Sequence, residues 1–249
     1  MPDAAIRHAV ARRPGGPGLV VAHRGAWDPA PQNSLAAFEQ AIADGADAIE
    51  LDVRRTADGR LVVVHDARVG GRAIARLDHA ALRARLDPGQ APELDEVLGT
   101  LAGRIGLDIE LKEDGAIGET MAVVARHLSP ERYVVTSFLD AVLPQVREAV
   151  PGARTGLLLA SGRPARRLQR RVEQARVDFI APHATLARTG VLAWAARREL
   201  PAWVWTVNDP RPLRTLLSDP RVAAVITDRT ALAVRVAAQI DGSGLRAAA

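Results

Sequence analysis

Two short runs, Ile49-Glu50-Leu51-Asp52-Val53 and Val62-Val63-Val64-His65-Asp66, determine the fold that we expect for this chain. Both are rich in aliphatic residues, many of them β-branched, which favour β-strands. A short polar segment that contains Asp58-Gly59 separates them. An Asp-Gly pair between two such runs is a strong hairpin signal. The sequence therefore predicts an antiparallel hairpin whose turn is centred near Ala57-Asp58.

This hairpin would bring three ionisable side chains together. A turn centred there places Glu50 roughly opposite His65 and Asp52 roughly opposite Val63. Because successive strand residues point to opposite faces, Glu50, Asp52 and His65 then share one face. A shared cation would offset the repulsion between the two carboxylates. The alternative is a polar strand face open to water, which the apolar run Ala48–Val53 around the carboxylates disfavours.

The composition limits the class of protein. With 249 residues and no linker of Gly/Ser or Pro-rich character, the chain is expected to form a single domain, residues 1–249. This length matches the roughly 250 residues of one β/α barrel. The chain has no cysteine, which excludes disulfides, thiolate metal sites and a cysteine nucleophile. Any metal must therefore have oxygen or imidazole ligands.

Charge and hydropathy disfavour nucleic-acid and membrane partners. The formal charge of +4 is small, and aromatic residues are only 3% of the chain. We expect the arginines between Arg163 and Arg176 to form a solvated helix face. No uncharged run reaches the ~18 residues of a membrane span, and Met1–Gly18 lacks the ~7–15-residue apolar region of a secretory signal. We therefore expect a cytoplasmic protein that binds no nucleic acid and does not insert stably into a membrane.

Apolar runs of strand length recur along the chain, with helix-period patterns between most of them. Eight of them fit one parallel sheet: Leu19–Ala22, Ala48–Val53, Ile105–Leu111, Tyr133–Thr136, Thr155–Leu159, Val177–Ala181, Ala202–Val207 and Ala223–Thr227. Alternating strands and helices imply parallel strands joined by right-handed crossovers. Eight such units at this length predict an α/β fold of the TIM (β/α)8 barrel type rather than an open doubly wound sheet.

The run Leu61–His65 does not fit this count, because its link to the preceding strand is too short for a parallel crossover. We predict that it forms an antiparallel arm above the barrel mouth. The segment after it, about residues 66–104, would then be a small insertion between the second and third barrel strands. It contains two helical patterns, Asp78–Arg85 and Leu94–Leu101. Insertions at this face of a barrel often cover a site.

Polar residues follow the predicted strands at their carboxyl ends, where barrel enzymes carry their active sites. They are His23, Arg24, Glu50, Asp52, Glu110, Lys112, Ser137, His183, Trp205 and Asn208. Lys112 is the only lysine in the chain, whereas the other basic side chains are arginines. This usage favours a specific role for Lys112 over an ordinary surface ion pair with Glu110 or Glu113. Ser137 and His183 could line a pocket or form hydrogen bonds at the barrel top.

Nine short motifs stand in one order between about Val20 and Ala231. They are His23-Arg24-Gly25, Pro31–Phe38, Glu50–Val53, Asp58-Gly59, Val64–Asp66, Glu110–Lys112, Ser137-Phe138, Trp205–Asn208 and Thr227–Arg229. Each motif is weak by itself, but the ordered set is specific. Together they resemble the glycerophosphodiester phosphodiesterases.

The resemblance implies a metal-dependent TIM-barrel hydrolase that converts a glycerophosphodiester to glycerol 3-phosphate and an alcohol. By motif position it makes His23 and His65 the general acid/base pair, and Arg24 and Lys112 the phosphate contacts. The metal ligands that it implies are Glu50, Asp52 and Glu110. The Trp205 ring at the mouth would suit a wall for the glycerol or the head group.

The chemistry of these side chains agrees with the implied roles. Three carboxylates without thiolates suit a hard cation, Mg²⁺ or Ca²⁺. Diester hydrolysis needs a base for the nucleophile and an acid for the leaving alkoxide, and two histidines can supply both near neutral pH. Arg24 can grip phosphate oxygens as a planar fork, and Lys112 adds a point charge. Water could attack directly, or the glycerol 2-hydroxyl could first form a cyclic phosphate.

The chain departs from the family pattern at two places near the expected site. Gln32 stands where the family usually has glutamate, which removes a carboxylate. After Asp66, a segment usually rich in threonine is replaced by Ala67–Arg72. The second departure bears on the choice of head group rather than on the chemistry.

Other functions agree with parts of the pattern. A phospholipase D-like enzyme acting on lysophospholipids resembles the same superfamily, but it would need an apolar rim that the insertion does not offer. A barrel glycosidase could use Glu50 and Glu110, but the paired histidines and the few aromatic residues disfavour it. A non-catalytic phosphate-binding module would be expected to have a broken histidine pair or carboxylate triad.

Overall fold

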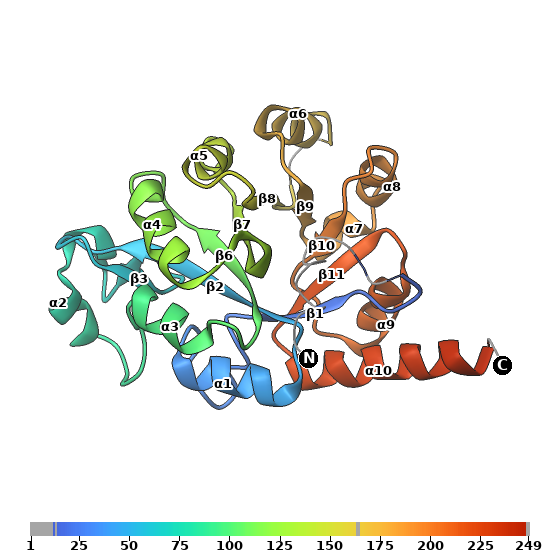
Figure 1. The fold of residues 1–249 in the computed structure, drawn as a ribbon, viewed down its shortest axis with the longest axis horizontal. Coiled ribbons are helices and arrows are strands. Elements are labelled where there is room, and N and C mark those ends of the chain that lie inside the picture. Colours follow the sequence, from blue (N-terminus) through green and yellow to red (C-terminus); the bar gives the residue numbers. More distant parts are fainter. Residues whose placement is uncertain (1–11, 13, 163–164, 248–249) are drawn as a thin grey trace.

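The computed structural model describes residue 12, residues 14–162 and residues 165–247, so most of Met1–Gly18 lies outside the described part. Within that part, eight parallel strands close into a barrel, because β1 pairs with both β2 and β11 (Figure 1). The strands are β1 (Leu19–His23), β2 (Ala48–Arg55), β6 (Gly106–Leu111), β7 (Tyr133–Ser137), β8 (Arg154–Leu159), β9 (Phe179–Pro182), β10 (Ala202–Val204) and β11 (Val222–Thr227). The predicted TIM barrel is confirmed.

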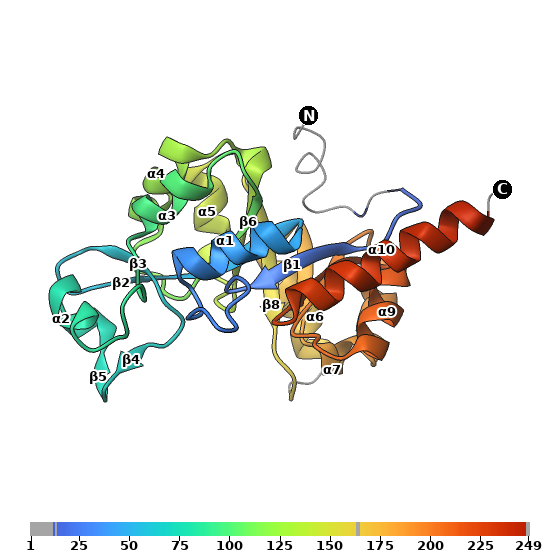
Figure 2. The ribbon, with the colours of Figure 1, turned by 90° about the horizontal axis from the view of Figure 1, so that it is seen from below.

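Helices cover the outside of this barrel. They are α1 (Leu35–Asp44), α3 (Leu94–Leu101), α4 (Ile117–His127), α5 (Val142–Ala149), α6 (Ala165–Ala175), α8 (Val191–Ala196), α9 (Pro210–Ser218) and α10 (Thr230–Ala247), with short helices η2 (Pro130–Arg132) and α7 (Ala184–Ala187). Figure 2 shows α1 and α10 side by side next to β1. No described helix is both long and apolar enough to cross a membrane.

Local sequence signals explain the bounds of α1. The Ser34 side chain accepts a hydrogen bond from the backbone N–H of Ala37 and so caps the first turn. Gly45 ends the helix in the left-handed conformation, with φ of 85°. Phe38 and Ala41 on its inner face are fully buried, which attaches the helix to the barrel.

The interior of the barrel changes character along its axis. Apolar side chains fill the amino-terminal part, where the rings of Phe179 and Trp203 lie 4.9 Å apart between their centroids. Polar side chains occupy the carboxyl-terminal part, where Glu50, Asp52 and Glu110 are all buried. The packed half supports the polar half, so the side chains at the mouth have a rigid base.

β3 (Leu61–Val63) is the predicted antiparallel arm, but the predicted register is wrong by one residue. Val53 pairs with Val63, and the Val64 N–H donates to the Asp52 carbonyl at 2.9 Å. The reason is the turn, which Thr56 and Arg60 close around three residues, with Gly59 at φ of 81°. His65 therefore lies beyond the paired strand rather than opposite Glu50.

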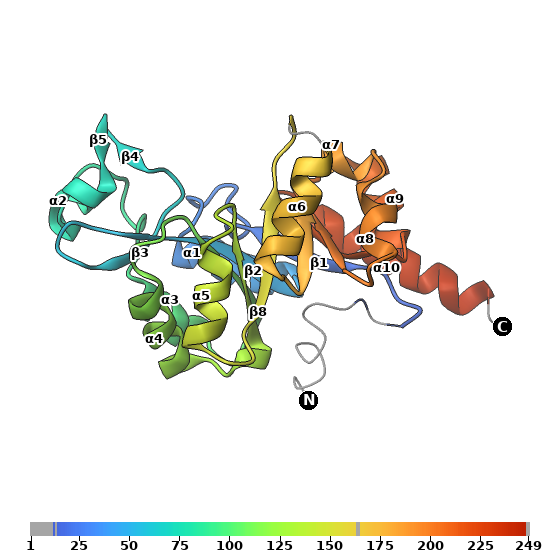
Figure 3. The ribbon, with the colours of Figure 1, turned by 90° about the horizontal axis from the view of Figure 1, so that it is seen from above.

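The segment between β3 and β6 has two parts. The first projects from one side of the barrel (Figure 3) and contains β4 (Arg68–Val69), β5 (Arg72–Ala73), the 3-10 helix η1 (Ile74–Arg76) and α2 (His79–Arg83). Helix α3 instead packs into the main core through four fully buried residues, Leu94, Val97, Leu98 and Leu101. It takes the place of the second barrel helix, so the projecting insertion ends near Glu93, earlier than the predicted residue 104.

The arginine-rich stretch from Arg163 to Arg176 is helical from Ala165, and residues 163 and 164 lie outside the described part. The prediction of a solvated helix face is wrong for Arg171, whose side chain is only 14% exposed. Its Nε lies 2.8 and 2.9 Å from the two Asp140 carboxylate oxygens, and its Nη2 donates to the Phe138 carbonyl at 2.7 Å. Arg171 therefore holds the loop between β7 and α5.

Gly25 should tolerate no side chain. Its φ is 84°, and a Cβ there would lie 2.8 Å from backbone atoms of Ala37. We expect Gly25→Ala to lower the free energy of unfolding by about 3 kcal/mol, from positive φ and from the clash together. Gly59→Ala is the matched control, because its φ of 81° is similar and no atom lies within 4 Å. It should cost about 1 kcal/mol, and equal losses in urea unfolding would contradict the explanation.

Candidate active site

A pocket of about 220 Å³ opens at the carboxyl ends of the barrel strands. Its lining residues are His23, Arg24, Glu50, His65, Asp108, Glu110, Lys112, Thr136, Phe138, Leu158, Trp205 and Ile226. Eight residues were predicted to have a catalytic, phosphate-binding or metal-binding role or to form the wall of the site. All of them except Asp52 line this pocket, and Asp52 lies directly behind as a fully buried side chain. The barrel therefore brings together residues that are far apart in the sequence.

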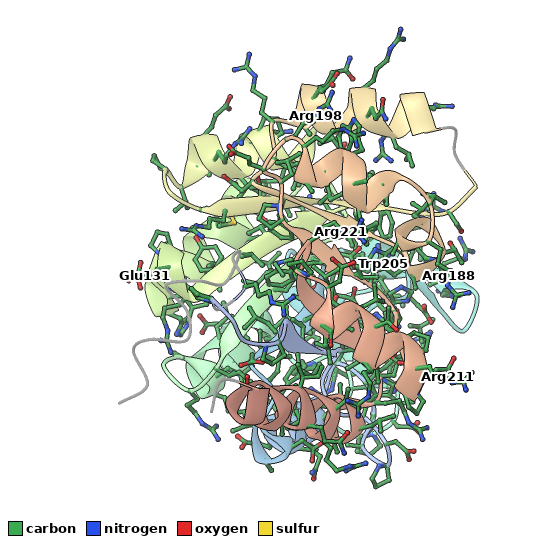
Figure 4. All side chains as sticks on the ribbon, turned by 90° about the vertical axis from the view of Figure 1, so that its right-hand side faces the viewer. Glu131, Arg188, Arg198, Trp205, Arg211 and Arg221 are labelled. Atoms are coloured by element: carbon green, nitrogen blue, oxygen red, sulfur yellow. The ribbon has the colours of Figure 1, made fainter. Side chains whose placement is uncertain are left out.

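Two larger cavities, of about 460 and 410 Å³, lie on either side of α8 among the outer helices. Arg188 and Arg211 line the first, and both lie at the outer surface in Figure 4, where Trp205 is also labelled. Neither cavity contains a histidine or a group of buried carboxylates. A third cavity, of about 370 Å³, has Asp228 and Arg229 in its lining but no histidine. Of these four pockets, the one of about 220 Å³ is therefore the one that combines acids, bases and cations.

Three carboxylates form one cluster in this pocket. Glu50, Asp52 and Glu110 each offer an oxygen, and these oxygens all lie within 4.8 Å of one another. The register of β2 and β6 causes this, because Asp52 pairs with Glu110 and Glu50 pairs with Asp108. Oε1 of Glu50 is buried without a hydrogen-bond partner. Such an oxygen set, with an unpartnered atom, fits a hard divalent cation.

Burial and repulsion change the pKa values of these carboxyl groups. Burial, with the nearby Asp52 and Glu110, raises the pKa of Glu50 well above its usual range. Burial raises the pKa of Glu110 to about 7. Burial acts in the same direction on Asp52, but the charges of Lys112 and Arg24 outweigh it and lower that pKa. A bound cation would favour the ionised form of all three, so metal binding should release protons.

Lys112 bridges two members of this cluster. Its Nζ lies 2.8 Å from Asp52 Oδ1 and 2.5 Å from Glu110 Oε1, and its side chain is only 9% exposed. Burial opposes the charged form, but the carboxylates outweigh this effect and raise the pKa of Lys112. Glu113 pairs with Arg54 instead, at 3.1 Å. Of the alternatives for Lys112, the pair with Glu110 is present but buried, and the pair with Glu113 is not formed.

Arg24 lies on a loop that folds over the carboxylates. Its backbone N–H donates to Oε2 of Glu50 at 3.0 Å, and its Nε lies 3.2 Å from Asp52 Oδ2. Its Nη1 donates to Gln32 Oε1 at 2.7 Å, while Asn33 Nδ2 donates to Asp52 Oδ2 at 2.8 Å. An amide at position 32 therefore orients Arg24 without neutralising its charge, whereas a glutamate would form an ion pair with it.

Each predicted catalytic histidine has a carboxylate partner. His23 Nδ1 lies 2.6 Å from Asp228 Oδ1, and His65 Nδ1 lies 2.8 Å from Asp66 Oδ1. A carboxylate next to Nδ1 favours the tautomer that carries its proton there and leaves Nε2 for proton exchange. Burial lowers the pKa of His65, although the hydrogen bond to Asp66 acts in the opposite direction.

Asp228 is the residue whose role the sequence reasoning missed. Asn208 Nδ2 donates to Asp228 Oδ2 at 2.7 Å, and the Asp228 N–H donates to Asn208 Oδ1 at 2.9 Å. Burial raises the pKa of Asp228, but the hydrogen bond and charge of His23, together with the hydrogen bond from Asn208, outweigh burial and lower this pKa. The sequence signal for this role is the position of Asp228 directly after the last barrel strand, because other site residues also lie at or directly after the carboxyl ends of their own strands.

The remaining polar residues at the barrel top have structural contacts. Trp205 Nε1 donates to the Ala181 carbonyl at 2.6 Å, and the Trp205 ring packs edge-on against Phe138 and His183. It therefore forms a fixed wall of the pocket. His183 caps α7, and Ser137 donates to the Leu111 carbonyl at 2.7 Å. Neither lines the pocket, so both belong to the hydrogen bonding of the barrel top.

Known proteins match this chain over most of its length. Residues 23–85 match the sequence model of the glycerophosphoryl diester phosphodiesterase family. A Mycobacterium tuberculosis protein, "Probable glycerophosphodiester phosphodiesterase 2", is 34% identical over 238 residues, which cover 86% of this chain and 88% of that protein. This chain belongs to the glycerophosphodiester phosphodiesterase family. The family resemblance of the sequence motifs is thereby confirmed.

Solved structures share the fold of this chain. The glycerophosphodiester phosphodiesterase of Thermotoga maritima is 27% identical, with a TM-score of 0.75 over 88% of this chain and 98% of its own. A phosphodiesterase of Oleispira antarctica, solved with the product sn-glycerol-3-phosphate, has a TM-score of 0.78 at 24% identity and covers 88% and 96% of the two chains. The second similarity concerns the fold alone.

Metal binding should depend on the carboxylate cluster. Glu50→Gln removes one charge and one oxygen ligand, so we expect the affinity for Mg²⁺ or Ca²⁺ to fall by at least about tenfold. Glu113→Gln changes a carboxylate outside the cluster and should leave the affinity unchanged. Titration calorimetry in two buffers of different ionisation enthalpy measures the affinity and the released protons together. Equal affinities for the two variants would contradict the assignment.

The raised carboxyl pKa values should make the metal-free protein less stable at higher pH. Burial raises the pKa of Asp108 to about 8, well above its value in the unfolded chain. The folded state then holds a proton that the unfolded state has lost, so stability falls as the pH rises from about 4 to 8, by up to about 1.4 kcal/mol per pH unit. Asp108→Asn should flatten this dependence, and exposed Asp114→Asn should not, in urea unfolding with chelator.

Proposed function

We propose that this chain hydrolyses glycerophosphodiesters to glycerol 3-phosphate and an alcohol with the help of a divalent cation. One observation carries the proposal: a buried carboxylate cluster, two carboxylate-paired histidines and two fixed cationic side chains share one pocket. These are the groups that metal-assisted hydrolysis of a phosphodiester needs. The names of the relatives point to the same reaction.

The residues present fit the expected metal. Glu50, Asp52 and Glu110 would hold Mg²⁺ or Ca²⁺, which agrees with the orphaned Glu50 oxygen and with the absence of cysteine from the whole chain. When bound, the cation would polarise a phosphoryl oxygen and stabilise the charge that develops in the transition state.

His23 and His65 would carry out the proton transfers. We assign His65 as the base, because its lowered pKa keeps it neutral near pH 7. His23 would protonate the leaving alkoxide through Nε2, while Asp228 holds Nδ1 and orients the ring. Asp228 is thus a positioning residue that does not touch the substrate.

Two cationic side chains would bind the phosphate. The Arg24 guanidinium is oriented by Gln32 and Asp52, and the Lys112 ammonium by Asp52 and Glu110. These contacts immobilise both groups before substrate arrives, so binding costs little side-chain entropy. Trp205 and Phe138 would form the apolar wall beside the glycerol or the head group.

The finer expectations on substrates and location stay predictions. A lysophospholipid substrate would need an apolar rim, and the projecting insertion carries mostly exposed polar side chains. We therefore prefer water-soluble diesters, and equal activity on lipid micelles would contradict this preference. Cytoplasmic location and the lack of a nucleic-acid partner are likewise proposals. Detection of a cyclic glycerophosphate would show that the 2-hydroxyl attacks first.

The decisive assay is release of glycerol 3-phosphate from glycerophosphocholine and glycerophosphoethanolamine with Mg²⁺, Ca²⁺ or chelator. Wild type should need a metal. His23→Ala and Glu50→Gln should lose at least about 10³-fold in kcat, and Asp228→Asn about 10²–10⁴-fold because the His23 tautomer changes. Glu113→Gln should remain active. Metal-independent turnover, or full activity of His23→Ala, would refute the proposed chemistry.

A further inference from the structure

Asp108 is a buried carboxyl group for which the reaction above has no use. It lies on β6 two residues before Glu110, on the same face of the strand and deeper in the barrel. The side chain is fully buried, and its Oδ1 accepts a hydrogen bond from the Thr136 hydroxyl at 2.7 Å. Its Oδ2 has no hydrogen-bond partner among the described residues. An unpartnered buried oxygen costs free energy, so a ligand that pairs with it gains affinity.

The surroundings of Asp108 indicate which part of a substrate lies next to it. Asp108 lines the pocket at its floor, below Arg24 and Lys112 at the mouth. Four apolar or aromatic side chains line the rest of the pocket: Leu158 and Ile226 from β8 and β11, and Phe138 and Trp205 from the positions directly after β7 and β10. Thr136 is the other polar residue here, and its hydroxyl hydrogen is already used by Asp108. The floor therefore suits a short carbon chain that carries a hydroxyl group.

A hydroxyl is the group that matches the free oxygen. It can donate or accept a hydrogen bond, so it pairs with a carboxyl oxygen in either protonation state. A phosphate would be repelled by the neighbouring carboxylates, and a quaternary ammonium has no N–H to donate. We propose that Asp108 Oδ2 binds a hydroxyl of the substrate's glycerol moiety and so selects glycerol over simple alkyl groups.

This inference rests on the proposed function and assigns the glycerol end of the same pocket. A site that hydrogen-bonds a substrate hydroxyl rejects an analogue without it, because the buried partner is then left unpaired. Asp108 would thus be a specificity-determining residue. The affinity for glycerol 3-phosphate tests the role of Asp108 by binding alone, without turnover. A failure of the activity assay and a failure of this inference can therefore be told apart.

The test compares glycerol 3-phosphate with propyl phosphate, which has the same phosphate and chain length but no hydroxyl. Calorimetric titration of the metal-loaded wild type should show at least about tenfold tighter binding of glycerol 3-phosphate. Asp108→Val should lower this ratio to about 1–2 and leave the affinity for propyl phosphate unchanged. Asp108→Asn should keep most of the ratio, because its carbonyl can still accept from Thr136 while its amide pairs with the hydroxyl.

Three results would overturn the proposal. The wild type could bind both ligands equally, which needs no variant and holds even if Asp108→Val fails to fold. Asp108→Val could keep the wild-type ratio. It could also weaken both ligands by the same factor, which would mean that Asp108 acts through Glu50 and the metal rather than on the hydroxyl. Circular dichroism of each variant checks the fold.

Discussion

The packing of four carboxyl groups at one end of the barrel is the constraint on which the site depends. Glu50 and Asp52 on β2 lie in register with Asp108 and Glu110 on β6, and all four are buried. Buried carboxylates this close repel one another and lose their hydration, so each must gain a proton, a cation or hydrogen-bond donors. Arg24 and Lys112 supply positive charge, and Asn33 and Thr136 supply hydrogen-bond donors. The raised pKa values of Asp108 and Glu110 favour a bound proton on these two groups.

Most of the side chains that compensate the repulsion between these carboxylates lie on loops or directly after a strand, not within the strands. Arg24 and Asn33 both have positive φ values, which turn the segment between them back over Asp52 so that both side chains reach it. Gly25 allows the same loop to pass against α1 at a distance that a side chain would prevent. Lys112 completes the compensation from the end of β6. Cationic groups that stabilise the apo site are thus already placed for an anionic phosphate.

The pocket has two chemically different faces, which agrees with the proposed binding of a metal on one side and of a small polyol on the other. The acids, bases and cations lie on β1, β2 and β6 or just after β1, β3 and β6. The apolar and aromatic side chains lie on β8 and β11 or directly after β7 and β10. Arg171 and the hydrogen bond of Trp205 fix Phe138 and Trp205 on the apolar face. A substrate with a charged end and a short hydroxylated carbon chain fits this division of the walls.

Much of this architecture could be read from the sequence, because strand periodicity, helix caps and the polar residues at strand ends are local signals. They predicted the barrel, the antiparallel arm and seven of the residues that line the pocket. The tertiary structure decided what depends on contacts between distant segments. The pairing of His23 with Asp228 joins the first and last strands, and the pairing of Lys112 with Glu110 and Asp52 rather than with Glu113 depends on burial. The hairpin register depended on the backbone conformation of Gly59, and the orphaned oxygen of Asp108 on the closure of the barrel around it. Local patterns therefore determined the order of the strands. The hydrogen-bond and ion-pair partners of the buried side chains depend on closure of the barrel, because a polar group that is cut off from water must find its partner inside the protein.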